Sequence, residues 1–244
     1  MTTSALRPAV PLLVLIIAGC IIAAVGNGIR SSFGLFTLPM TGDLGLTREG
    51  WGMAMAIQNL AWGIAQPFAG AYADRVGTGR TIAIGLAVYA LGVLTMAFSP
   101  DAGWLTLTAG VIAGVGIAVS SFSVVMVAFG RSVPMEKRSM IFGVATAASS
   151  FGQFAFAPIS QGFINAFGWQ SALIYLALAL LLVIPLSYAL RGRAESPAGH
   201  ADLPFMEALA KAWGHSSYRL LVIGFFVCGF HLAFINVHMP AYLV

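Results

Sequence analysis

Long apolar runs alternate with short polar segments along the whole chain, and this alternation predicts membrane-spanning helices. An α-helix rises about 1.5 Å per residue, so about 20 mainly apolar residues cross the roughly 30 Å of hydrocarbon in a bilayer. Runs of suitable length lie at residues 11–39, 50–73, 81–98 and 104–130. The charge-free stretch at 139–190 is too long for one helix, and we expect a break at 167–170. With a last run at 218–244, the pattern predicts seven spans.

The composition agrees with a protein whose main solvent is lipid. Hydrophobic residues make up 59% of the chain and charged residues only 8%, whereas soluble domains carry about 25% charged residues. Such a chain has too few polar side chains to cover the surface of a soluble domain. We therefore predict an all-α fold, a polytopic bundle of membrane helices.

One long polar segment, residues 191–217, divides the chain into two parts. We predict that residues 1–190 form a six-helix N-terminal transmembrane bundle. Residues 218–244 would form the first helix of a C-terminal bundle, which is truncated here. The segment between them is predicted to be a cytoplasmic linker, in which residues 203–213 form a short amphipathic helix on the membrane surface.

The basic residues indicate how the chain is oriented. Of the 12 Lys and Arg residues, Arg30 lies within a span and Arg48 lies on the side opposite the N-terminus. All the others lie on the side of the N-terminus, and basic loops are retained in the cytoplasm. We therefore predict a multi-pass protein of the plasma (inner) membrane with a cytoplasmic N-terminus. The bases are spread over separate loops, which argues against binding of nucleic acid.

Arg30 is the candidate substrate-binding residue. It shares one face of the first span with Asn27, Ser31 and Gly34, which are three to four residues away. An arginine within a span costs at least about 2.5 kcal/mol on insertion scales, so it faces a cavity or extends to the headgroups. None of the acidic residues lies within a predicted span. An anionic substrate is therefore an economical partner for Arg30, and Asn27 and Ser31 are predicted to share its site.

His231 is a candidate for proton coupling, because histidine titrates near neutral pH. At helical rise His231 lies about 18 Å from Arg219, deep in the seventh span, whereas His238 lies about 28 Å away, near the interface. The alternative role for His231 is packing with a hydrogen bond. Uncharged polar residues within the spans could line the transport path or bond neighbouring helices, and we expect most of them to bond helices; they are Gln58, Asn59, Gln66, Gln153, Gln161 and Asn165.

The segment from Gly70 to Arg80 concentrates charge between the second and third spans. Asp74 and the arginines Arg75 and Arg80 can form charge-assisted pairs and interact with helix ends. Gly77 permits a turn with positive φ. We interpret the segment as a gating loop that holds helices together in one state and releases them in another. The alternative is a solvated turn that only obeys the positive-inside rule.

This segment resembles the G-x-x-x-D-R-x-G-R loop signature of the major facilitator superfamily, with Gly79 inserted or substituted before the last basic residue, Arg80. G-I-R-S-S-F-G-L-F at 28–36, G-L-T-R at 45–48 and F-G-W-Q-S-A at 167–172, after a span that contains Pro158, resemble the monocarboxylate and oxalate/formate branch. The resemblance covers the whole chain as the first seven of twelve helices. It implies that Arg30 handles an anionic substrate.

The sequence departs from the family at two points. The fourth span lacks the arginine typical of many drug/proton antiporters. The chain also ends before the eighth helix, where the monocarboxylate branch keeps its second substrate-binding arginine.

We therefore expect a secondary transporter that moves small organic anions, monocarboxylates or dicarboxylates, by alternating access and is driven by protons or a counter-anion. Arg30, Asn27, Ser31 and His231 would bind substrate, and Gly70, Asp74, Arg75, Gly77 and Arg80 would form the gate. The chain has no nucleotide-binding G-x-x-x-x-G-K-S/T loop, no HExxH and no CxxC motif. We accordingly expect no cofactor, no metal and no enzymatic activity.

Two other functions are compatible with the sequence. The chain could export neutral or cationic compounds, or it could be a truncated membrane protein that does not transport and instead associates with other subunits. Transporters of this type place their site between two six-helix halves, so the missing C-terminal half would be a partner if the chain is a fragment. Five further apolar spans beyond Val244 in the coding frame would indicate a complete transporter.

Overall fold

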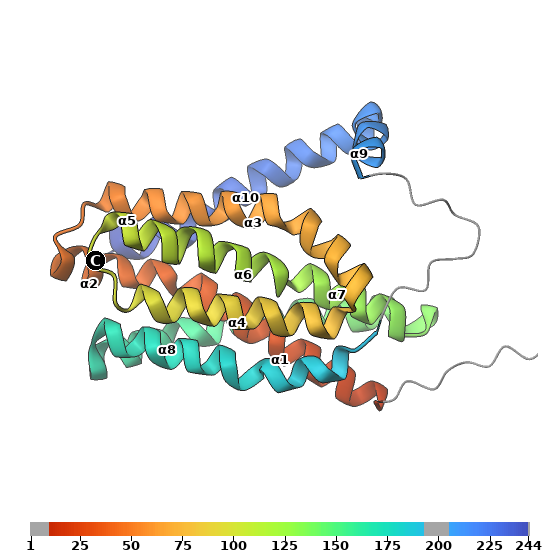
Figure 1. The fold of residues 1–244 in the computed structure, drawn as a ribbon, viewed down its shortest axis with the longest axis horizontal. Helices are drawn as coiled ribbons and strands as arrows, with labels where there is room; N and C mark the ends of the chain where they lie inside the picture. Colours follow the sequence, from red (N-terminus) through yellow and green to blue (C-terminus); the bar gives the residue numbers. More distant parts are fainter. Residues whose placement is uncertain (1–9, 193–204, 244) are drawn as a thin grey trace, which may run out of the picture.

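The computed structural model describes residues 10–192 and 205–243, and these residues form helices with no strand. The long helices run side by side along the long axis of the molecule (Figure 1). The predicted all-α membrane bundle is confirmed.

The elements follow the predicted spans closely. The first three spans comprise α1 (Leu12–Ser31), η1 (Ser32–Phe36), α2 (Thr37–Leu44), α3 (Arg48–Val76) and α4 (Thr78–Met96). The next three comprise α5 (Ala102–Leu105), η2 (Thr106–Ile112), α6 (Ala113–Val119), α7 (Phe122–Ser132), α8 (Met135–Val183) and η3 (Ile184–Leu190). The remaining elements are α9 (Phe205–Gly214) and α10 (Ser216–Tyr242).

In the part of the chain that the structure describes, five helical stretches are long and apolar enough to cross a membrane: Leu12–Leu44, Thr78–Met96, Ala102–Ser132, Met135–Leu190 and Ser216–Tyr242. α3 is outside this group because polar residues, including Gln58, Asn59 and Gln66, interrupt its apolar sequence. It nevertheless runs the length of the bundle beside α6 (Figure 1).

Glycines with positive φ lie at two of the turns that the sequence predicted. Gly168, with φ 80° and ψ 163°, is the non-helical residue within α8, so this element contains two spans that meet at the predicted break. Gly77, with φ 101°, is the single residue between α3 and α4. The predicted gating loop at 70–80 is therefore corrected: it consists of the end of α3, one turning residue and the start of α4. Glycine adopts this backbone region without steric cost.

The fourth span is not the single regular helix that its apolar run suggests. It begins with α5, continues as the π-helical η2 and α6, and is interrupted at Ser120 and Ser121 before α7. Serine side chains stabilise this interruption: the Ser120 hydroxyl donates to the Gly116 carbonyl at 2.7 Å, and Gln66 Nε2 donates to Ser121 Oγ at 2.8 Å. The polar residues of α3 thus help to shape the fourth span.

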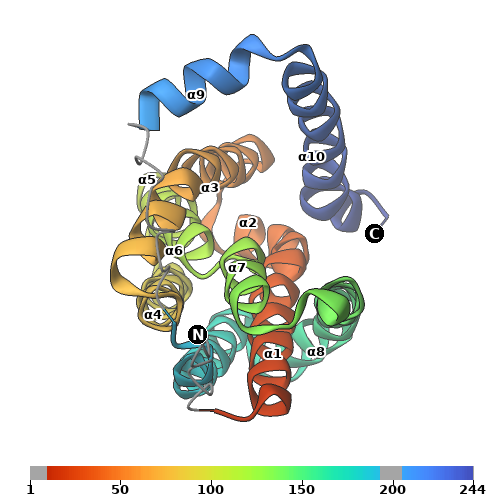
Figure 2. The ribbon, with the colours of Figure 1, turned by 90° about the vertical axis from the view of Figure 1, so that its right-hand side faces the viewer.

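α10 lies along one side of the bundle and contacts it mainly through η1 (Figure 2). Of its described residues only Val237 is buried. At the closest approach, a methyl group on Gly34 would overlap the Asn236 backbone oxygen. α9 is a short helix in the region where an amphipathic helix was expected. The assignment of α10 to a second bundle stays a prediction.

Candidate functional site

Arg30 points into the bundle and meets two residues of α3. Its Nη2 donates a hydrogen bond to Asn59 Oδ1 at 2.8 Å. Its Cζ lies 4.3 Å from the centre of the Trp62 ring, within the range of cation–π attraction. Neither partner carries a charge, and no described acidic residue forms an ion pair with Arg30. The guanidinium is therefore held in place while its positive charge stays uncompensated.

A small cavity beside Arg30, which we call the Arg30 cavity, is formed by three separate elements of the chain. The first span contributes Arg30 and Phe33, α3 contributes Gln58 and Asn59, and α10 contributes Asn236. The cavity measures about 10 Å³, which is space for about one water molecule. In this conformation α10 therefore closes over the guanidinium and leaves no room for an organic molecule.

The other predicted site residues of the first span are directed elsewhere. Asn27 Nδ2 donates to Ser149 Oγ of α8 at 2.7 Å. The Ser31 hydroxyl lies 2.8 Å from the Gly28 carbonyl and 3.5 Å from the Gln153 carbonyl of α8. Neither residue is among those that line the Arg30 cavity. The structure therefore does not bring Asn27 and Ser31 together with Arg30 in this conformation.

His231 is exposed on α10 and does not line the Arg30 cavity. The polar residue of α10 that reaches this cavity is Asn236, five residues further along. A role of His231 in proton coupling stays a prediction.

Sequence reasoning did not assign Asn59, Trp62 or Asn236 to the site. The sequence feature that could have identified Asn59 was its place in the group of polar residues inside the span that forms α3. Gln58 does bond a neighbouring helix as expected, because its Nε2 donates to the Ala109 carbonyl at 2.6 Å. Asn59, the adjacent residue, also bonds a neighbouring helix, because its Oδ1 accepts from Arg30 of α1.

The predicted gating residues lie at the end of the bundle where α3 meets α4. Asp74 forms an ion pair with Arg131 at the end of α7. Gly70 lies in the final turns of α3, and the side chains of Arg75 and Arg80 are exposed. Arg131 was not among the predicted gating residues. Its pairing with Asp74 connects two spans that are neighbours in space and not in sequence.

The turn at Gly77 is also tied to the end of the sixth span. The Thr78 hydroxyl donates to the Leu190 carbonyl at 2.6 Å, and the Thr78 backbone N–H donates to the Gly192 carbonyl at 3.0 Å. Gly79 lies against the backbone of Ser187, where a side chain would not fit. The segment therefore joins the ends of the second, third, fourth and sixth spans.

At the opposite end of the bundle, a second polar contact joins distant parts of the chain. Trp169 Nε1 donates to Asp43 Oδ2 at 2.6 Å. Asp43 is in α2, and Trp169 directly follows the turn in α8. Asp43 is one of the few acidic residues at this end of the bundle, and its carboxylate accepts this hydrogen bond.

Comparison with known proteins identifies relatives of the whole fold. A family model described as Major Facilitator Superfamily matches residues 12–244. The chain is 25% identical over 227 residues to the uncharacterized MFS-type transporter YcxA of Bacillus subtilis (strain 168), with 88% of this chain and 54% of that protein covered. It is 28% identical over 164 residues to monocarboxylate transporter 13 of Rattus norvegicus, with 66% and 37% covered.

A solved structure, the D-xylose-proton symporter, matches 87% of this chain and 54% of that one with a TM-score of 0.55 and 17% identity. This likeness concerns the fold alone. The chain spans about half the length, or less, of the curated relatives that it matches. The family model covers nearly the whole chain, which confirms the resemblance found in the sequence. This multi-pass membrane protein belongs to the major facilitator superfamily.

Proposed function

We propose that this transporter chain serves the movement of small organic anions, monocarboxylates or dicarboxylates, by alternating access. The observation that carries the proposal is the uncompensated charge of Arg30 beside a cavity formed by three separate elements. A guanidinium binds a carboxylate through two parallel hydrogen bonds. Asn59 and Trp62 leave the charge of Arg30 available to such a ligand.

Two further observations support an anionic substrate. An arginine inside a span is costly unless it serves a cavity or a partner, and no described acid neutralises this one. Several distant relatives are named monocarboxylate transporters. We extend that substrate class to this chain as part of the proposal. Protons or a counter-anion would drive the transport, and the substrate would cross the membrane chemically unchanged.

In the proposed cycle, α10 moves relative to the first span. It touches η1 near Asn236, while its N-terminal half is exposed. Separation of this contact would open the Arg30 cavity to one side of the membrane. Such transporters complete the site with a second six-helix half; with α10 as its first helix, the other five would pack on the exposed face of α10. The end that carries Asp74 would face the cytoplasm, in accordance with the distribution of basic residues.

Uptake into proteoliposomes that contain the protein as the cell makes it tests the substrate class. We expect labelled lactate to accumulate and unlabelled short carboxylates to compete with it, because they share the group that Arg30 binds. A neutral amide of the same size should not compete. Accumulation of a hydrophobic cation together with no competition by carboxylates would favour an exporter of neutral or cationic compounds. An imposed pH gradient and internal anion loading distinguish the two driving forces.

Asp74→Asn is expected to slow transport while leaving substrate affinity almost unchanged. The pair with Arg131 is partly exposed, with 56% of the Asp74 side chain accessible, and such pairs contribute up to about 1 kcal/mol. The maximal uptake rate should therefore fall by at most roughly fivefold. Initial uptake rates over a range of substrate concentrations measure both quantities.

Glu136→Gln is the matched control, because Glu136 is an exposed acid at the same end and forms no ion pair with a described residue. Reversal of the charges in Asp74→Arg with Arg131→Asp should restore part of the lost rate. Equal maximal rates in Asp74→Asn and the unmodified protein would mean that the segment is an inert turn.

A further inference from the structure

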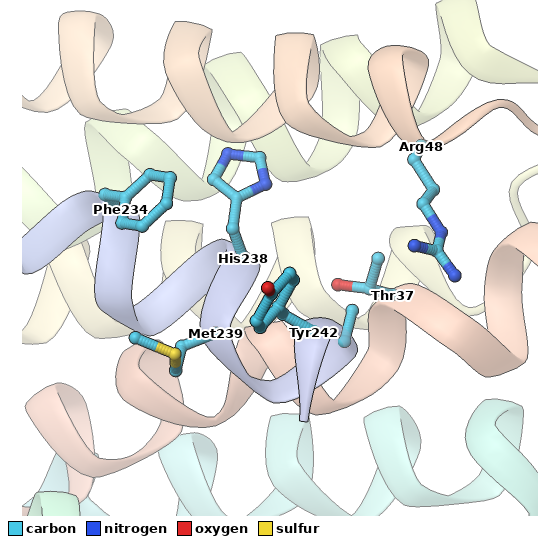
Figure 3. A pocket seen from close by; sticks show the side chains of 7 residues that line it. Thr37, Arg48, Phe234, His238, Met239 and Tyr242 are labelled. Atoms are coloured by element: carbon cyan, nitrogen blue, oxygen red, sulfur yellow. The ribbon is translucent and has the colours of Figure 1, made fainter. Parts of the chain in front are cut away.

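A larger cavity lies between α10, α2 and the start of α3, at the end of the bundle opposite Asp74. We call it the Arg48 cavity. Its volume is about 380 Å³. Its lining includes Thr37, Arg48, Phe234, His238, Met239 and Tyr242 (Figure 3). It is large enough for a small organic molecule, unlike the cavity beside Arg30.

Thr37 supplies a polar group without a partner in this cavity. Only 3% of the residue is exposed, and its hydroxyl has no hydrogen-bond partner among the described residues. In Figure 3 the hydroxyl lies between Arg48 and Tyr242. Thr41, one turn later, instead satisfies its hydroxyl by donating to the Thr37 carbonyl at 2.7 Å. Buried hydroxyls are normally hydrogen-bonded, so that of Thr37 points to a ligand in the cavity.

The charged side chain that lines the Arg48 cavity is a base, Arg48. Arg48 is the first residue of α3 and forms no ion pair with a described residue. The N-terminus of a helix is itself positive, so Arg48 and the helix favour an anion together. No acidic residue lines the cavity. Asp43, from neighbouring α2, is bonded to Trp169.

The remaining lining residues define the kind of anion. The ring of Phe234 and the thioether of Met239 form an apolar wall, and the ring centres of Phe234 and His238 are 5.5 Å apart. The imidazole of His238 and the hydroxyl of Thr37 can donate hydrogen bonds. This combination suits a carboxylate group attached to a short hydrocarbon tail.

We propose that the Arg48 cavity is a second, separate binding site for a small carboxylate, which the anion occupies before or after it reaches Arg30. The choice of a carboxylate rests on the proposed function. Thr37 follows Arg30 by about two helical turns, or roughly 10 Å along the first span. On α10, Phe234 faces the Arg48 cavity, whereas Asn236 faces the Arg30 cavity. Gly34 and Asn236, which contact each other, both line the Arg30 cavity, and neither lines the Arg48 cavity.

A cysteine reporter at Met239 tests this site directly, with Cys20 and Cys228 replaced by serine. The protein is placed in phosphatidylcholine nanodiscs, and the rate of thiol modification is measured with an anionic and a cationic methanethiosulfonate reagent. We expect the anionic reagent to react faster and propionate to slow its reaction. Arg48→Gln should remove the preference for the anionic reagent and raise the half-protecting propionate concentration about tenfold, as expected for loss of a hydrogen bond to a charged group.

Three further variants test whether the protection by propionate arises in the Arg48 cavity. Arg219→Gln, which removes an arginine from the other end of α10, should behave like the unmodified protein. Thr37→Val should weaken protection, whereas Thr37→Ser should keep it. Protection should persist in Arg30→Ala, so the second site remains testable even if the proposed role of Arg30 fails.

Two results would overturn the proposal. One is protection by propionate at the same concentration in Arg48→Gln and in the unmodified protein. The other is loss of protection when anionic phosphatidylglycerol replaces part of the phosphatidylcholine, which would assign the cavity to a lipid phosphate.

Discussion

Replacement of Arg30 by alanine is expected to abolish saturable uptake of small carboxylates without impairing membrane insertion. Truncation of one partner of a desolvated, hydrogen-bonded charge pair costs about 2–5 kcal/mol, so apparent affinity should fall at least roughly thirtyfold. Asn59 and Trp62, the partners of Arg30, are uncharged and cannot replace the guanidinium. Initial rates of labelled lactate uptake over a wide concentration range measure the loss.

The Arg30→Ala variant also separates a functional role from a structural one. Removal of a charge from a span saves at least about 2.5 kcal/mol on insertion scales. The variant should therefore insert at least as well as the unmodified protein while its uptake is lost. Arg30→Lys is the matched control, because it keeps the positive charge but loses the planar guanidinium that donates two parallel hydrogen bonds. This variant should retain part of the uptake. An unchanged KM in Arg30→Ala would exclude Arg30 from the substrate site.

The spans and their turns could be predicted because each depends on local sequence. An apolar run of about 20 residues has few alternatives to a membrane helix. Gly168 breaks a long charge-free stretch, and Gly77 separates two apolar helices. The interruption of the fourth span at Ser120 and Ser121 was not predicted, because it depends on contacts such as that of Ser121 with Gln66 of α3.

The composition of the site could be predicted less well, because it depends on how each helix is rotated about its axis. Arg30 was identified from its charge within a span. Its contacts with Asn59 and Trp62, however, require α3 to turn the face that carries these two residues toward Arg30. The apolar residues of α10 are spread around the whole helix, so its sequence gives no clear preferred face. The predicted His231 is exposed, and Asn236 reaches the Arg30 cavity instead.

The partner of Asp74 illustrates the same limit for charged residues. Arg131 is 57 positions away in the sequence, and the segment around Asp74 contains two nearer arginines. Local reasoning therefore favoured Arg75 and Arg80, whose side chains are exposed. The pairing follows from the approach of α7 to α3 in space.

Gly34→Ala is expected to prevent α10 from closing against the first span and thereby to arrest the transport cycle. Pro240 lacks a backbone N–H, so it cannot donate to the Asn236 carbonyl within α10. That carbonyl instead lies against Gly34, where an added methyl group would overlap it. Overpacking of this kind costs about 1–3 kcal/mol, which shifts the equilibrium from closed to open by about five- to 150-fold.

Gly26→Ala on α1 is the matched control, because a methyl group there meets nothing within 4 Å. Alanine also has the higher helix propensity, so Gly26→Ala should leave transport intact or stabilise the chain slightly. Spin labels at Thr41 and Tyr242 report the separation of α2 from α10, and their distance should increase in Gly34→Ala only. Normal uptake with an increased label distance in Gly34→Ala would show that transport does not require the approach of Asn236 to Gly34, and an unchanged distance would show that the added methyl group does not keep α10 from closing. An increased distance with uptake lost would identify this backbone contact as the gate between the Arg30 and Arg48 cavities.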